Sequence, residues 1–110
     1  MMMQLVDRAY SFYKQGNYDA ATGDFNKAIN FDPNDSLIYY YRARNYLAAE
    51  SWNAAIVEFT NAIKLDSNDP DYFLWRGNAK GRMGNKEGAE ADYHAALNLD
   101  PNLDKDDMWY

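Results

Sequence analysis

Few side chains in this chain of 110 residues could carry out chemistry. The single histidine, His94, lies between Tyr93 and Ala95 at a helical spacing, which favours a half-exposed helix residue over a catalytic base. The lack of cysteine excludes a disulfide framework, a thiolate metal site and a cysteine nucleophile. The sequence contains no glycine-rich phosphate loop, nucleophile elbow or His–Glu metal motif. It therefore predicts no catalytic residue, no metal ligand and no cofactor, and we expect no enzyme.

The run from Asp66 to Asp71 gathers carboxylates and is a candidate calcium loop. A calcium-binding EF loop needs Gly at its sixth place and a bidentate Glu at its twelfth. Counted from Asp66, these places hold Asp71 and Gly77. We interpret the run instead as a turn followed by a helix cap, in which Asp69 precedes a proline suited to the first helical turn.

Acidic residues dominate the charge, since 17 Asp and Glu against 11 Lys and Arg give a formal net charge of −6. Nucleic acids and anionic membranes are bound chiefly through basic patches, so neither is the predicted partner. No stretch approaches the roughly 20 apolar residues that a membrane-spanning helix needs. The first eight residues show no basic region of a signal peptide, and we expect a cytoplasmic protein.

The elements that position these side chains follow from an internal repeat of about 34 residues. Within each repeat, apolar residues recur at three- and four-residue steps, which predicts two helices. Such a pair cannot bury its apolar face alone, so we expect an all-α solenoid of six stacked helices, each about 12 to 14 residues long. The repeating columns are Ala21, Ala55 and Ala89; Ala28, Ala62 and Ala96; Phe25, Phe59 and Tyr93; Arg8, Arg42 and Arg76; and Asp24, Glu58 and Asp92.

The turns between helices also repeat. Gly16 can adopt the left-handed conformation that ends a helix. Asn17 follows it and can accept a hydrogen bond from a free amide of the next helix, and its counterparts Ser51 and Asn85 are also strong N-cap residues. We therefore expect side-chain caps at these places.

These columns resemble the tetratricopeptide repeat (TPR) family. The resemblance covers about residues 2 to 103 and implies a domain over 1–103, a right-handed α-solenoid with repeats at 2–35, 36–69 and 70–103. Departures are Glu50 at the turn glycine, Ser67 at the proline, and Lys80 and Lys86 at two aromatic places. The matching residues are Gly16, Tyr18, Ala21, Phe25, Ala28 and Pro33; Tyr39, Ala43, Tyr46, Trp52, Ala55, Phe59 and Ala62; and Gly77, Gly84, Ala89, Tyr93, Ala96 and Pro101.

Two columns of opposite charge could be mistaken for binding residues. Arg8, Arg42 and Arg76 lie 16 residues before Asp24, Glu58 and Asp92, respectively. We interpret them as a structural ladder of ion pairs between packed helices.

The resemblance implies that the first helix of each repeat lines a concave groove that binds a peptide of a protein partner. Tyrosine, tryptophan and arginine, which are enriched in binding hot spots, are frequent there, and we centre the predicted patch on Tyr10, Tyr41 and Trp75. The alternative is that these residues pack between repeats. The groove residues are Met3, Val6, Asp7, Tyr10, Tyr13, Lys14, Leu37, Tyr40, Tyr41, Arg44, Leu47, Ala48, Asp71, Leu74, Trp75, Asn78 and Arg82.

One class of partner is not expected. TPR proteins that hold the C-terminal tail of heat-shock chaperones use a clamp of Lys, Asn, Asn, Lys and Arg. The resemblance places Val6, Tyr10, Tyr41, Asp71 and Trp75 at these positions. We therefore predict that the partner is not the heat-shock chaperone C-terminal tail.

Residues 104–110 form a short acidic tail that ends in Met108, Trp109 and Tyr110. Related arrays commonly finish with an extra polar helix, and this segment is too short for a stable isolated helix. Three interpretations stay open: the tail folds over its own last repeat, a second copy of the chain covers that end or the groove in a self-associating scaffold, or the chain is a fragment of a longer array.

Overall fold

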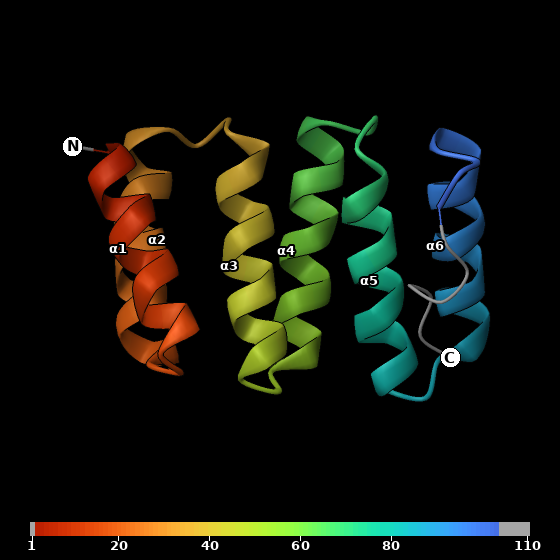
Figure 1. Ribbon diagram of the computed structural model, residues 1–110, viewed down its shortest axis with the longest axis horizontal. Coiled ribbons are helices and arrows are strands. Elements are labelled where there is room, and N and C mark those ends of the chain that lie inside the picture. The colour runs from red at the N-terminus through yellow and green to blue at the C-terminus, as the bar shows by residue number, and fades with distance from the viewer. Residues whose placement is uncertain (1, 104–110) are drawn as a thin grey trace.

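The computed structural model describes residues 2–103 and places them in six α-helices joined by short turns (Figure 1). The lengths of 13 or 14 residues agree with the sequence prediction. The predicted tail, with Met108, Trp109 and Tyr110, lies outside the described residues. The helices are α1 (Met2–Lys14), α2 (Tyr18–Phe31), α3 (Ser36–Ala48), α4 (Trp52–Leu65), α5 (Pro70–Arg82) and α6 (Lys86–Leu99).

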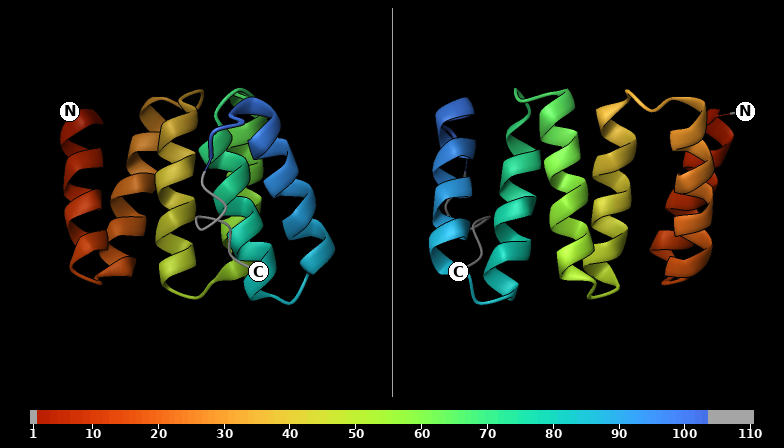
Figure 2. Two further views of the ribbon diagram at one scale, coloured as in Figure 1. Left: turned by 45° about the vertical axis from the view of Figure 1, so that its right-hand side comes forward. Right: turned by 180° about the vertical axis from the view of Figure 1, so that it is seen from behind.

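The helices stand in a row in chain order, with α1 and α2 at one end and α6 at the other (Figures 1 and 2). Each helix packs on the next one in sequence. In addition, α3 contacts both α1 and α5, whereas α2, α4 and α6 do not contact one another within residues 2–103. The first helices of the pairs therefore approach one another and share the inner, concave side of an all-α solenoid.

Three turns require the left-handed backbone conformation. Gly16 and Gly84 have φ angles of 80° and 87°, and Glu50 has φ 64° at the equivalent place. A Cβ on Gly16 or Gly84 would meet no atom within 4 Å, so the requirement at these turns is conformational rather than steric. Glu50 therefore adopts a conformation that costs a non-glycine residue roughly 1–2 kcal/mol.

The side-chain caps agree with the sequence only in part. Asn85 accepts a hydrogen bond from the Gly88 amide at 2.9 Å, as predicted. The prediction was wrong for Asn17 and Ser51, which form no side-chain cap hydrogen bond. Both residues are exposed, so solvent can satisfy the first amides of α2 and α4. Asp69 caps α5 by accepting from the Asp71 amide at 3.0 Å, with Pro70 in the first turn.

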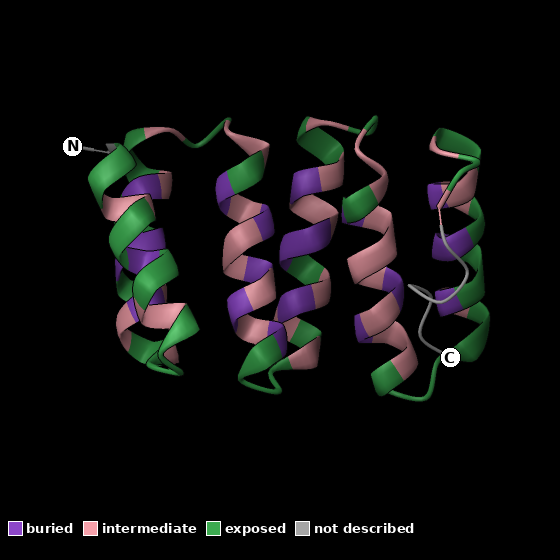
Figure 3. Ribbon diagram, viewed as in Figure 1, coloured by how far each residue is buried: buried purple, intermediate pink, exposed green. Residues whose placement is uncertain are grey.

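The core consists of the repeating small and aromatic columns. Ala21, Ala55 and Ala89 are fully buried, which lets paired helices approach closely, and Phe25, Phe59 and Tyr93 fill the space beside them. The buried residues lie along the helices, while the turns that join the helix ends are mostly exposed (Figure 3). The predicted packing role of these columns is confirmed.

The arginine ladder is present in all three helix pairs. The Arg8 Nε donates to Asp24 at 2.7 Å, and the Arg76 Nε donates to Asp92 at 2.9 Å. Arg42 pairs with Glu58 in the same way. Arg42 and Arg76 each also reach the preceding helix pair, where the Nη1 atoms donate to Asn26 at 2.8 Å and to Thr60 at 3.2 Å. The ladder thus joins the two helices of a repeat and neighbouring repeats.

Candidate functional site

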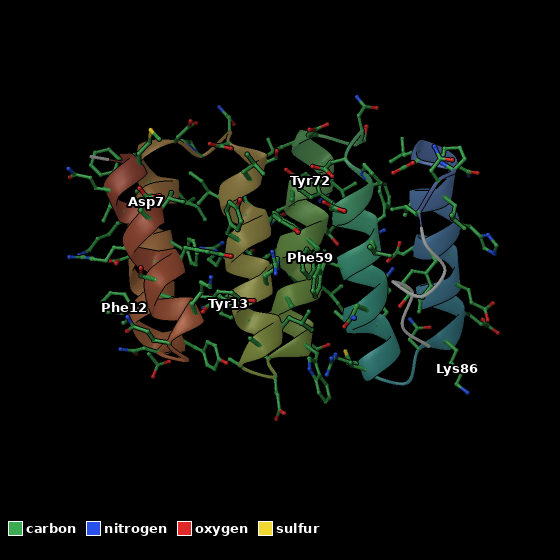
Figure 4. The ribbon with its side chains drawn as sticks, viewed as in Figure 1. Asp7, Phe12, Tyr13, Phe59, Tyr72 and Lys86 are labelled. Carbon is green, nitrogen blue, oxygen red and sulfur yellow. The ribbon has the colours of Figure 1, made fainter. Side chains whose placement is uncertain are left out.

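The face formed by α1, α3 and α5 carries most of the predicted groove residues, and we call it the groove face. Tyr13 lies on the side of α1 toward α3, and Asp7 lies nearer the start of that helix (Figure 4). The rings of Tyr10 and Tyr13 stack at 5.7 Å, and Tyr10 meets Tyr41 of α3 edge-on at 5.9 Å. The structure therefore brings together aromatic residues of the first two repeats on this face.

Tyr40 has a different place from the one that the sequence predicted. It is only 7% exposed and belongs to the core cluster with Phe59 and Tyr72, whose ring centroids lie 6.1 and 5.0 Å away. Burial raises the pKa of its hydroxyl to about 12. On a helix, three consecutive tyrosines point in different directions, and Tyr40 is the one directed into the core. It therefore supports the groove face from beneath rather than lining its surface.

Arg44 of α3 lies in a cage of aromatic rings. Its guanidinium carbon is 4.6 Å from the ring centroid of Trp75, 5.7 Å from that of Tyr40 and 5.9 Å from that of Tyr13. Cation–π attraction of this kind stabilises a partly desolvated arginine. Its Nε is buried and has no hydrogen-bond partner among the described residues. Sequence analysis placed Arg44, Tyr13 and Trp75 on one face but could not show that they form one cage.

Two of the hollows on the groove face lie at opposite ends of α3. The first, which we call the Leu37 hollow, measures about 140 Å³ and is mainly apolar. The second, the Arg44 hollow, measures about 290 Å³. The Leu37 hollow is lined by Met3, Val6, Asp7, Asp35, Leu37, Ile38 and Tyr41, and the Arg44 hollow by Tyr13, Arg44, Leu47, Ala48, Glu50, Trp75 and Arg82.

Some lining residues were missed by sequence analysis. Asp35 caps α3 by accepting a hydrogen bond from the Leu37 amide at 3.0 Å, and this cap places its carboxylate beside the Leu37 hollow. Glu50 lies in the turn after α3. Neither falls on a helix face, so helical periodicity could not assign them to the groove. Six of the predicted residues line neither hollow: Tyr10, Lys14, Tyr40, Asp71, Leu74 and Asn78. The Asn78 Oδ1 accepts a hydrogen bond from the Arg82 Nε at 2.9 Å.

The outer side of α6, where the self-association alternative places a second copy, carries polar side chains. In α4, Trp52 and Ile56 pack on the core cluster of the second and third repeats, and Thr60 accepts a hydrogen bond from Arg76. The equivalent residues of α6 are Lys86, Glu90 and His94, and all are exposed. Lys86 lies at the far end of the row (Figure 4). Polar side chains at these places are typical of a terminal, capping repeat.

The run from Asp66 to Asp71, the candidate calcium loop, forms a turn and a helix cap. Asp66 accepts a hydrogen bond from the Asn68 amide at 3.0 Å, which fits the predicted turn before the Asp69 cap. Within residues 2–103, no helix has the length and apolar character needed to cross a membrane.

Comparisons with known proteins agree with this geometry. Family models described as tetratricopeptide repeats match residues 4–35 and 70–103, and a model described as a TPR repeat matches residues 43–84. No curated protein matches the chain.

Solved structures give the same result. The first TPR domain of Spaghetti (RPAP3), bound to the HSP90 peptide SRMEEVD, is 26% identical with a TM-score of 0.88, over 93% of this chain and 81% of that one. The second TPR domain, bound to the same peptide, is 29% identical with a TM-score of 0.84, over 90% and 92%. The Yersinia enterocolitica chaperone SycD, in complex with a peptide of the translocator YopD, shares the fold at 21% identity and a TM-score of 0.87, over 94% and 79%.

Proposed function

The chain belongs to the tetratricopeptide repeat family, and from this premise we propose that it is a non-catalytic interaction module that binds a peptide segment of a protein partner on the groove face. The observation that carries the proposal is the pair of hollows at opposite ends of α3, joined by partly exposed aromatic rings. Concave sites with apolar walls and a few placed polar groups are typical of ligand binding.

Three features support a peptide as the ligand. Two domains of similar fold, at 26% and 29% identity, are bound to a peptide in their solved structures. The Leu37 and Leu47 ends of α3 are ten residues apart, which corresponds to about 15 Å along a helix axis. An extended segment of about five residues spans that distance. The net charge of −6 favours such a partner over nucleic acid or an anionic membrane.

We do not assign the heat-shock chaperone tail as the partner. The residues at the clamp positions are Val6, Tyr10, Tyr41, Asp71 and Trp75. None of the five supplies the cation or the amide that the clamp uses there. The groove face therefore offers aromatic surface where those proteins bind a terminal carboxylate.

The test is selection from a displayed library of random peptides, followed by fluorescence anisotropy on the enriched peptides. Leu37 is 46% exposed in its hollow, so Leu37→Ser should keep the fold and weaken binding at least fivefold, about 1 kcal/mol. The matched control is Val57→Ser, because Val57 is 58% exposed on α4. Enriched peptides that bind both variants equally well, or the absence of enrichment, would reject the proposal.

Self-association remains the alternative use of the same surface. Size-exclusion chromatography with light scattering over a wide concentration range distinguishes the two. A dimer that dissociates in Leu37→Ser but not in Val57→Ser would mean that the groove face binds a second copy instead of a foreign peptide.

A further inference from the structure

We propose that the Arg44 hollow is an anion-accepting subsite that binds the side-chain carboxylate of a glutamate or aspartate within the bound segment. The inference rests on the proposed function, because it names the chemistry that one end of the groove face selects. Its basis is the contrast between Arg44 and the other arginines, the aromatic cage, and the charges around the hollow.

Arg44 is the arginine whose Nε lacks a partner. The Nε atoms of Arg8, Arg42 and Arg76 each donate to a carboxylate, and that of Arg82 donates to Asn78. The Nε of Arg44 is buried without an acceptor in the described part of the chain. A buried donor without an acceptor is costly, and the cost is larger for a charged group. A carboxylate that reached this nitrogen through a small movement of the surrounding rings would relieve this cost, whereas an apolar group would not.

The cage prepares the guanidinium for a carboxylate. The rings of Trp75, Tyr40 and Tyr13 lie within 6 Å of its central carbon. They hold the group and exclude part of the water, while the N–H donors at the edge of a guanidinium remain its means of binding a carboxylate. A charge-assisted hydrogen bond is stronger in such surroundings than in open water.

The charges around the hollow also favour an acidic ligand. Arg82 lines the same hollow, and the Lys14 ammonium lies 5.5 Å from the ring centroid of Tyr10 nearby on the groove face. Glu50 contributes a carboxylate to the lining, but no ion pair joins it to Arg44 within residues 2–103. The Leu37 hollow, by contrast, contains Asp7 and Asp35. The groove face is therefore polarised, and only its Arg44 end complements an acid.

The spacing of the hollows gives the ligand a pattern. The two ends of α3 lie about 15 Å apart, and an extended peptide advances about 3.3 Å per residue. An apolar residue in the Leu37 hollow therefore places the acidic residue four or five positions away. We take this residue to present a side-chain carboxylate from within the segment rather than a chain terminus.

The experiment is a nuclear magnetic resonance titration of the full ¹⁵N-labelled chain at constant ionic strength. Three small probes separate the sources of the carboxylate: N-acetylglutamate α-amide carries it on the side chain, N-acetylglutamine α-amide is the neutral isostere, and N-acetylalanine carries it at the terminus. We expect the glutamate probe alone to shift the Arg44 Nε–H and Trp75 indole signals in a saturable way. The Arg8 Nε–H, which already donates to Asp24, is the internal reference.

Variants assign the effect to Arg44. Arg44→Gln should abolish the saturable shift of Trp75, and Lys64→Gln, which removes the same charge from an exposed place on α4, should leave it unchanged. Equal shifts with the glutamine probe, preference for N-acetylalanine, or no saturation at Arg44 would overturn the inference. Thermal unfolding of Arg44→Gln monitors the fold, and the wild-type titration decides the matter even if that variant fails to fold.

The outcome is separable from that of the proposed function. Peptides that bind the groove face with no preference for an acid would reject the subsite and keep the interaction module. A glutamate-specific shift at Arg44 without any enriched peptide would reject the proposed function and keep the anion site.

Discussion

Arg42 and Arg44 stand two residues apart on α3 and face opposite regions of the molecule. Arg42 pairs with Glu58 and donates to Asn26 of the preceding repeat. Arg44 is enclosed by aromatic rings on the groove face, and its Nε has no partner among the described residues. A helix turns about 100° per residue, so the two side chains leave it in nearly opposite directions. The Nε of Arg42 donates to a carboxylate of the fold, whereas the Nε of Arg44 has no acceptor among the described residues.

The difference is visible in the repeat itself. The counterparts of Arg42 in the other repeats are Arg8 and Arg76, and all three form the same ion pair. The counterparts of Arg44 are Tyr10 and Asn78. A contact required by stacking must recur in every repeat, because every repeat has the same neighbours. A position that departs from the column is free of that requirement and can serve a ligand.

The largest effect on the free energy of unfolding is expected from removing the ion pair between Arg42 and Glu58. Arg42→Met leaves the carboxylate of Glu58, which is 6% exposed, without its main partner. Loss of one member of a buried pair costs about 3–5 kcal/mol. We expect a fall of this size in the free energy of unfolding, measured by urea denaturation with circular dichroism.

A double variant provides the control for this prediction. Arg42→Met with Glu58→Met removes both charges, and apolar replacement of a whole buried pair is often neutral. We expect most of the lost stability to return. A single variant that unfolds at the wild-type urea concentration would contradict the assignment of Arg42 to the fold.

Tyr40 lies between the two regions and gives the next largest effect. Its ring packs on Phe59, and its other side meets Arg44. Burial raises the pKa of its hydroxyl from 10.0 to about 12. The unfolded chain therefore loses this proton near pH 10 while the folded chain keeps it, so stability is full below pH 10 and falls as the pH rises toward 12.

The expected loss from this hydroxyl is at most about 2–3 kcal/mol. Urea denaturation at a series of alkaline pH values measures it, and Tyr40→Phe, which lacks the titrating hydroxyl, is the control. An identical alkaline loss in Tyr40→Phe would assign the pH dependence to other tyrosines, such as Tyr72, whose pKa burial also raises.

The same distinction explains how much the sequence could predict. The small and aromatic columns, the ladder and the six helices followed from features that recur three times. The groove face was predicted as a set of residues, but its details depend on non-recurring neighbours. The burial of Tyr40 and the cage of Arg44 arise from contacts between helices, which a helical period does not specify. Asp35 and Glu50 entered the site from turns.

A smaller effect on the free energy of unfolding is expected from replacing Arg44. Arg44→Gln loses cation–π attraction, which contributes about 0.5–1 kcal/mol at partly exposed sites. It also removes a buried donor that has no partner within the described residues, which offsets part of that loss. We expect a change of about 1 kcal/mol or less, measured by urea denaturation beside Lys64→Gln. A loss as large as that of Arg42→Met would mean that both arginines serve the fold.

The smallest effect should come from Arg8, the ladder member at the end of the row. Its side chain is 59% exposed, against 17% for Arg42, so water can replace it more easily at Asp24. Its hydrogen bond nevertheless holds the pKa of Asp24 below the usual range, against the opposing effect of burial. The stability that this pair contributes is therefore present above the unfolded pKa of aspartate and is lost as the pH falls through the folded value. We expect Arg8→Gln to destabilise the chain less than Arg42→Met and to raise the pKa of Asp24, as followed by ¹³C carboxyl resonances. If the carboxyl of Asp24 titrates at the same pH in both chains, Arg8 does not stabilise its charged form.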